Sequence, residues 1–179
     1  MKLASQSSGL RPQDVLVLLK LFSHQKIDWR QLDLAQDLGL SQAEIANSLS
    51  RLNRSSLIDD TKKKPQPLAS LDFILHGVKY FYPAVFGTMS RGTPTGHSAR
   101  PLKGKLVIEE NLEWVWPDSE GEQRGLILHP IYETAPSAAK KDPKLHELLA
   151  LLDSIRAGGP RERKLAEVEL RTRILKREK

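Results

Sequence analysis

The chain has 179 residues, with 28 Lys and Arg against 22 Asp and Glu and a formal net charge of +6. It contains no cysteine, which excludes disulfide bonds, thiolate zinc sites and a cysteine nucleophile. No apolar run approaches the roughly 20 residues that a membrane-spanning helix needs, and the N-terminal segment lacks the apolar stretch of a signal peptide. We therefore expect a cytoplasmic protein of one domain, or of one small domain with an extension.

The N-terminal third is rich in leucine and valine at helical spacing. Residues 10–22 predict a mostly buried helix, and residues 29–38 predict a second helix that ends at Gly39. The segment Ser41–Glu44 reads SQAE, a capping box in which the serine hydroxyl and the glutamate carboxylate each accept a backbone N–H. A third helix is expected to follow it. Two helices joined by a short turn that contains glycine describe a helix-turn-helix.

A resemblance to a known family rests on this part of the chain, about residues 10–60. The pattern resembles the winged helix-turn-helix of MarR-like prokaryotic transcriptional regulators. It consists of the string Leu34-Ala35-x-x-Leu38-Gly39-Leu40-Ser41 followed by Ile45, Leu49, Leu52 and Leu57-Ile58. The resemblance implies that the third helix enters the major groove of DNA. The wider pattern looks like a family of short prokaryotic regulators, some of which accompany toxin or defence genes.

The outer face of the third helix is small and polar and carries two arginines. Small residues allow a close approach to base edges, while Asn and Arg suit adenine and guanine edges. The helix N-terminus also favours a phosphate oxygen. The alternative is an ordinary surface helix whose polar face meets water. We expect DNA contacts from this face and from the lysines that follow it, at Ser41, Gln42, Ala43, Asn47, Ser50, Arg51, Arg54, Lys62, Lys63 and Lys64.

The chain departs from the family pattern after the third helix. A winged helix continues into a β-hairpin, but here the lysines at 62–64 are followed by apolar residues at helical spacing. We expect a reduced or missing wing and a fourth helix over residues 67–82. The lysines would either contact phosphates or form a solvated linker.

The middle of the chain predicts irregular structure and a few strands. Residues 83–104 are rich in Gly, Pro and Thr and contain no acid. They would form either a basic arm along DNA phosphates or a strap over the core, of which we favour the strap. Strands are expected at 106–108, 113–116 and 124–128, the last two as a hairpin. Its two tryptophans are expected in the core, and the acids around them suit a protein partner.

Two further helices are expected after Asp142, which is typical of an N-cap before a proline. Gly158-Gly159-Pro160 separates them, and the resulting helical hairpin predicts dimerisation, with packing on its own domain as the alternative. The predicted fold is mainly α with a small β component (α+β). Its segments are a winged helix-turn-helix over 1–66, a linking helix, basic loop and β-hairpin over 67–136, and a helical hairpin over 137–179.

No catalytic or metal-binding constellation is visible, because the histidines are scattered and fit no ligand motif. We expect no enzyme activity, no cofactor and no metal. The leading hypothesis is a homodimeric, sequence-specific regulator, a repressor, that binds an inverted repeat in double-stranded DNA. The alternative is an antitoxin-like module that binds and neutralises a partner protein, a toxin or defence component, through its acidic hairpin.

Overall fold

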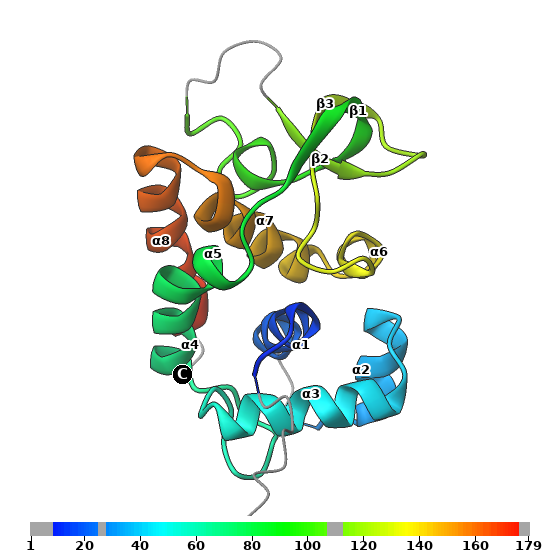
Figure 1. The fold of residues 1–179 in the computed structure, drawn as a ribbon, viewed down its shortest axis with the longest axis vertical. Coiled ribbons are helices and arrows are strands. Elements are labelled where there is room, and N and C mark those ends of the chain that lie inside the picture. The colour runs from blue at the N-terminus through cyan, green and yellow to red at the C-terminus, as the bar shows by residue number, and fades with distance from the viewer. Residues whose placement is uncertain (1–8, 25–27, 107–112, 176–179) are drawn as a thin grey trace, which may run out of the picture.

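A computed structural model describes residues 9–24, 28–106 and 113–175, and this part of the chain is mainly α-helical with a small β-sheet, as predicted. Figure 1 shows helix α1 near the centre of an elongated molecule. Helices α2 and α3 lie at one end of the long axis, and the sheet lies at the other. None of the helices in the described ranges has the length and apolarity that a membrane crossing requires.

The N-terminal helices form close to the predicted boundaries, with α1 at Pro12–Ser23, α2 at Gln31–Leu38 and α3 at Gln42–Arg54. Gly39 ends α2 in the left-handed conformation, at a φ of 65°. The capping box forms as well: Ser41 Oγ accepts the N–H of Glu44 at 3.2 Å, and the Glu44 carboxylate accepts the N–H of Ser41 at 2.8 Å. The predicted helix-turn-helix is therefore confirmed as a structure.

A minimal hairpin, residues 57–66, follows α3, and we call it the wing. Ile58 and Pro65 form an isolated antiparallel bridge. The N–H of Gln66 donates to the carbonyl of Leu57 at 2.8 Å, and the N–H of Asp59 donates to the carbonyl of Lys64 at 2.9 Å. The expectation of a reduced wing is confirmed.

The expected fourth helix forms over residues 67–81, interrupted by one π-helical segment. In chain order it comprises α4 at Pro67–Asp72, the π-helix η1 at Phe73–Gly77 and α5 at Val78–Phe81. Insertions of this kind occur as single turns inside α-helices.

The sheet differs from the prediction in two ways. It consists of β1 at Phe86–Pro94, β2 at Trp114–Pro117 and β3 at Gln123–Leu128. The expectation of irregular chain over residues 83–104 is wrong for residues 86–94, which form β1, the longest strand of the described ranges. The expected hairpin is wrong too: β2 and β3 each pair antiparallel with β1 and run parallel to each other, which closes a small barrel.

Two glycines make this closure sterically feasible. Gly92 of β1 pairs with both Pro117 and Gln123, so β2 ends and β3 begins beside the same residue. A Cβ atom on Gly121 would overlap the backbone of Gly92. No side chain fits in that space, so the connection between β2 and β3 can turn back along β1 only with glycine there.

The segment after β1 is a strap over α7, the interpretation that we favour from the sequence. Residues 95–99, which include the 3₁₀ helix η2 at Gly96–Ser98, are buried, and η2 packs against α7. Of the strand expected at 106–108, Leu106 is not in a strand, and the other two residues lie outside the described ranges.

The C-terminal part contains α6 at Ala135–Lys141, α7 at Pro143–Ala157 and α8 at Pro160–Leu175. The two last helices form the predicted hairpin, and it packs on its own chain, with α7 against α1 and α8 against α4. The buried side of α8 carries Ala166, Leu170 and Ile174. Val168, on another side of the helix, is 51% exposed.

A buried polar cluster joins the sheet to α7. Asp153, only 1% exposed, accepts hydrogen bonds from Thr95 Oγ1, Trp116 Nε1 and Arg156, each at 2.7 Å. Burial raises the pKa of Asp153, and its three donors offset part of that effect. Trp114 and Trp116 are both buried, so the expectation that they belong to the core is confirmed.

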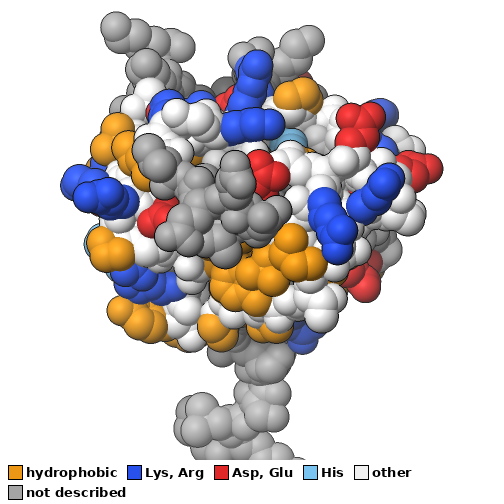
Figure 2. Space-filling model, turned by 90° about the horizontal axis from the view of Figure 1, so that it is seen from above, with side chains coloured by type: hydrophobic (Ala, Val, Ile, Leu, Met, Phe, Trp, Pro, Cys, Tyr) orange, Lys and Arg blue, Asp and Glu red, His pale blue; other side chains and the backbone are white. Residues whose placement is uncertain are grey.

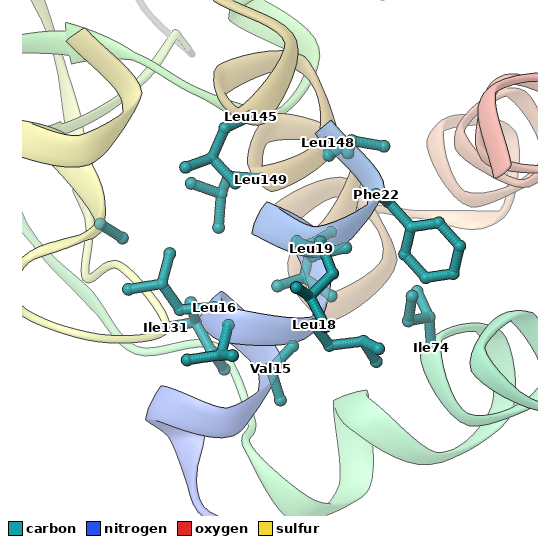
Figure 3. Close-up of a cluster of buried hydrophobic side chains, with 14 of the residues drawn as sticks. Val15, Leu16, Leu18, Leu19, Phe22, Ile74, Ile131, Leu145, Leu148 and Leu149 are labelled. Carbon is teal, nitrogen blue, oxygen red and sulfur yellow. The ribbon is translucent and has the colours of Figure 1, made fainter. Parts of the chain in front are cut away.

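One hydrophobic cluster draws on all three predicted segments, and α1 is at its centre. Figure 3 shows Leu16, Leu19 and Phe22 of α1 among side chains from α7, η1 and the segment before α6. The side chains from Val15 to Leu19 of α1 are each at most 1% exposed. The boundaries predicted at residues 66 and 136 therefore separate kinds of local structure that share a core.

Lys20 forms ion pairs that link α1 to the end of α2 and to the start of α7. Its side chain is 6% exposed, and Nζ lies 2.8 Å from Asp142 and 2.9 Å from Asp37 of α2. Asp142 also accepts from Ser23 Oγ and caps α7 through the N–H of Leu145. Burial acts to raise the pKa of Asp142, but these hydrogen bonds together hold it below its ordinary value.

The depressed pKa of Asp142 predicts acid sensitivity with a definite sign. The unfolded chain binds the proton on Asp142 more tightly than the folded chain does. The stabilisation that the ionised Asp142 gives the fold is therefore complete at a pH above its ordinary pKa of 3.8, and it is lost as the pH falls through the pKa of the folded state. Asp142→Asn keeps an acceptor for the cap but cannot ionise. Urea unfolding from about pH 3 to about pH 7 should show a smaller loss of stability on acidification for this variant than for the wild type. An identical acid dependence of the two proteins would contradict the assignment.

Candidate nucleic-acid interface

Helix α3 lies at the end of the molecule farthest from the sheet (Figure 1), and a stripe of small and polar residues runs along its exposed side. Ala43, Asn47 and Arg54 are exposed and Ser50 is half-buried. They follow one another at helical spacing, so they share one side of the helix. We call these four residues the α3 stripe. Ser41 and Gln42, also expected in the site, are exposed at its N-terminal end.

Arg51 does not belong to this surface. Its side chain is 7% exposed, and its Nε and Nη2 atoms each donate to the Asp14 carboxylate at 2.7 Å. Nη2 also donates to Ser48 Oγ at 3.2 Å. The hydrogen bonds with Asp14 raise the pKa of Arg51, which keeps the guanidinium charged. The expectation that Arg51 lies on the exposed face is wrong, because its guanidinium neutralises a fully buried carboxylate of α1.

The wing is organised by Asp59. Its carboxylate accepts from Thr61 Oγ1 at 2.7 Å and from the N–H groups of Lys63 and Lys64 at 3.1 and 3.0 Å. Burial acts to raise the pKa of Asp59, but these donors lower it below its ordinary value. Asn53 Nδ2 donates to the carbonyl of Asp59 at 3.0 Å, which fixes the wing to the end of α3.

The three predicted lysines have three different environments. Lys62 is exposed, and its Nζ reaches back to Ser50 Oγ of the α3 stripe at 3.1 Å. Lys63 is anchored: its Nζ donates to the carbonyl of Trp29 at 2.6 Å and lies 4.3 Å from the centre of the Trp29 ring. Lys64 is exposed. Lys62 and Lys64 can therefore meet a ligand, while Lys63 holds the wing in place.

Charge is distributed unevenly along α3. The first turn contains Glu44. Burial of Tyr132 is the main cause of its raised pKa, and the charges of Glu44 and Glu133 add to it. Both acids therefore lie near Tyr132, at this end of α3. Glu44 is the partner of Ser41 in the capping box, and the hydrogen bonds from Ser41 lower its pKa. The exposed cations Arg54, Lys62 and Lys64 lie at the other end. An anionic ligand would be attracted to the C-terminal half of α3 and to the wing.

Sequence reasoning missed two structural roles, those of Arg51 and Lys63. The sequence contains a partial signal for each of these roles. Asp14 stands directly before an unbroken apolar run, and a carboxylate entering a core needs a cationic partner. Trp29, the first residue of the expected second helix, offers its ring to a cation. Neither signal identifies which cation among several is the partner.

Comparison with known proteins returns no match, whether to protein-family models, to curated proteins or to solved structures.

The Asp14–Arg51 pair predicts a large effect on stability at a position that looks like a surface site in the sequence. Arg51→Leu leaves a buried carboxylate without its partner, which should cost about 3–5 kcal/mol in the free energy of unfolding. The matched control Arg54→Leu removes an exposed arginine and should change it by no more than about 0.5 kcal/mol. Urea unfolding measures both.

The double variant Asp14→Leu/Arg51→Leu separates loss of the pair from loss of packing. It should recover a substantial part of the stability that Arg51→Leu loses, because no charge is then left buried. Equal and small effects of Arg51→Leu and Arg54→Leu would show that Arg51 is not held as described.

Proposed function

We propose that the protein is a sequence-specific DNA-binding regulator, a repressor, that binds double-stranded DNA through α3 and the wing. The observation that carries the proposal is the α3 stripe: small and polar side chains on the outer side of the second helix of a helix-turn-helix, with Lys62 and Lys64 beside them. Helices of this kind read base edges while the surrounding cations contact phosphates.

The base-reading residues of this proposal are Asn47 and Arg54, with Ala43 and Ser50 allowing close approach. Gln42 contributes at the N-terminal end. Asn suits adenine and Arg suits guanine in the major groove. The N-terminal end of α3 is less suited to phosphate than its C-terminal half, because Glu44 is part of the capping box and Glu133 is near. The duplex would therefore lie toward the wing.

The wing supports this function by its rigidity. Three contacts fix it relative to α3 and to the segment before α2: Lys62 with Ser50, Asn53 with Asp59, and Lys63 with Trp29. Lys62 is held with a φ of 57°, a conformation that is uncommon outside glycine. Groups that are already positioned lose little conformational entropy on binding, which favours phosphate contacts at this place.

A homodimer is part of the proposal, because two copies read two half-sites and gain affinity from the linkage. The C-terminal hairpin would contribute mainly through the outer side of α8, since most of α7 is buried within its own chain. That outer side carries Val168, 51% exposed, and Arg171, whose Nε atom lies 3.0 Å from Glu167.

The alternative is an antitoxin-like module that neutralises a partner protein. Trp114 and Trp116, in the acidic segment expected to take part, are buried, so they offer no docking surface. What favours a protein partner is instead the exposed face of the sheet, where Arg91 of β1 and Arg124 of β3 lie.

The test of the leading proposal is a selection of bound duplexes from a random pool with the full chain. We expect an inverted repeat with half-sites about one helical turn, or about 34 Å, apart. Asn47→Ala should weaken binding to the selected duplex by about 1–3 kcal/mol and relax one base position. Enrichment of no sequence would overturn the proposal, and an equal loss on selected and random DNA would overturn the role of Asn47.

The wing lysines predict a change in the salt dependence of binding. A plot of log K against log salt has a negative slope. Lys62→Gln/Lys64→Gln should make this slope less steep by about 1 for each phosphate that the variant no longer neutralises. Arg100→Gln/Lys103→Gln removes the same charge from two exposed residues beyond η2 and serves as the control. A titration from low to physiological salt gives the slopes. The same slope in wild type and wing variant would show that these lysines do not touch phosphates.

A further inference from the structure

Two arginines lie side by side on the exposed surface of the sheet. Arg91 of β1 and Arg124 of β3 are directly opposite in the antiparallel register, and both are exposed. Residues that face each other in this way project from the same side of a sheet, and like charges there are destabilising. Among the described residues, no carboxylate lies within ion-pair distance of either guanidinium.

Apolar residues adjoin the arginines on the same face. Met89 and Leu126 are also directly opposed, two residues along each strand from the arginines, so strand alternation places them on the same side as the arginines. Met89 is 40% exposed and Leu126 is half-buried. Phe86, 43% exposed, lies beyond a bulge in β1 with its ring 5.4 Å from that of Trp114. We call Arg91, Arg124, Met89, Leu126 and Phe86 the arginine–apolar face.

The arginine–apolar face belongs to the sheet end of the molecule. Figure 2, a view onto that end, shows hydrophobic side chains gathered on the surface there. Helix α3, which carries the α3 stripe, lies at the opposite end of the long axis (Figure 1). A duplex bound along α3 would therefore not cover this face, so a ligand of its arginines would be a different molecule.

We propose that the arginine–apolar face binds an extended peptide segment of a partner protein in which an apolar and an acidic residue are separated by one position. The acidic side chain would bridge Arg91 and Arg124, and the apolar side chain would pack on Met89, Leu126 and Phe86. An extended peptide repeats every two residues at the same spacing as a strand, so its side chains match the two opposed pairs. A guanidinium pair binds a carboxylate with charge-assisted hydrogen bonds.

A peptide fits this face better than a nucleic acid does. The turn between β2 and β3 approaches β1 at Gly92, next to Arg91, and carries Glu120 and Glu122, both exposed. A continuous phosphate backbone that crossed the arginines along the strands would run on to these acids. A single carboxylate with an apolar neighbour on the other side meets no such repulsion.

A second copy of this chain also fits the arginine–apolar face less well than such a peptide does, because like charges would repel. Two copies of the face meeting about a twofold axis would bring four guanidinium groups together. The partner is therefore one that supplies the acid.

The test uses the full chain as bait for a displayed library of random peptides. We expect enrichment of peptides that contain an apolar residue and Asp or Glu two positions apart. A synthetic peptide of the selected sequence, labelled for fluorescence polarisation, then measures affinity. Arg91→Gln/Arg124→Gln should weaken its binding by at least about tenfold, the size expected for charge-assisted hydrogen bonds. Arg161→Gln/Lys164→Gln removes the same charge from exposed residues of α8 and should leave the affinity unchanged.

Other outcomes would overturn the proposal. These are a library that enriches no acid, a peptide that binds the double variant as tightly as the wild type, or an equal loss in the α8 control. Binding of single-stranded (dT)20 that the double variant abolishes would assign the face to nucleic acid instead. Sedimentation that shows a dimer in the wild type and a monomer in Arg91→Gln/Arg124→Gln would assign it to self-association. Unchanged urea unfolding of the double variant excludes misfolding as the cause, and none of these readouts depends on duplex binding at α3.

Discussion

The burial of α1 determines where the other elements can lie. Its apolar side chains are removed from water on nearly every side, and each buried leucine contributes about 1.5–3 kcal/mol. Its two buried charges give the packing direction. Asp14 faces Arg51 of α3, and Lys20 faces Asp142 at the start of α7. A buried charge without its partner is costly, so α3 and α7 can take only the positions in which these pairs form.

The helices could be predicted because their signals are local. The capping box at Ser41, the left-handed Gly39 and the cap at Asp142 each act within a few residues, and the structure contains all three. The sheet could not be predicted, since strand pairing depends on residues far apart in the chain. Gly92 pairs with two strands at once, and the sequence of β1 shows no apolar alternation that would mark it as a strand.

The candidate site was predictable in outline and not in its charged residues. Asn47 and Arg54 lie on the outer side of α3, as the helical period predicts. Arg51 lies at the boundary between the buried and exposed sides of α3, where the helical period does not predict whether a side chain is buried. Its ion pair with Asp14, which is distant in the sequence, holds it in the interior. Lys62 and Lys63 are neighbours with the same chemistry, yet only tertiary contact with Trp29 distinguishes the anchored one.

The closed sheet also constrains how this protein can associate with other chains. Each of its three strands pairs with both others, so the sheet leaves no strand with a wholly free edge among the described residues. Among the described residues, the stretches of strand edge left open are short, such as the side of β1 before Gly92 that β2 does not cover, and this limits the backbone pairing by which many extended segments and aggregating chains attach to sheets. Side chains therefore contribute much of the recognition at this end of the molecule, which favours a partner for its chemical character more than for its ability to form a strand.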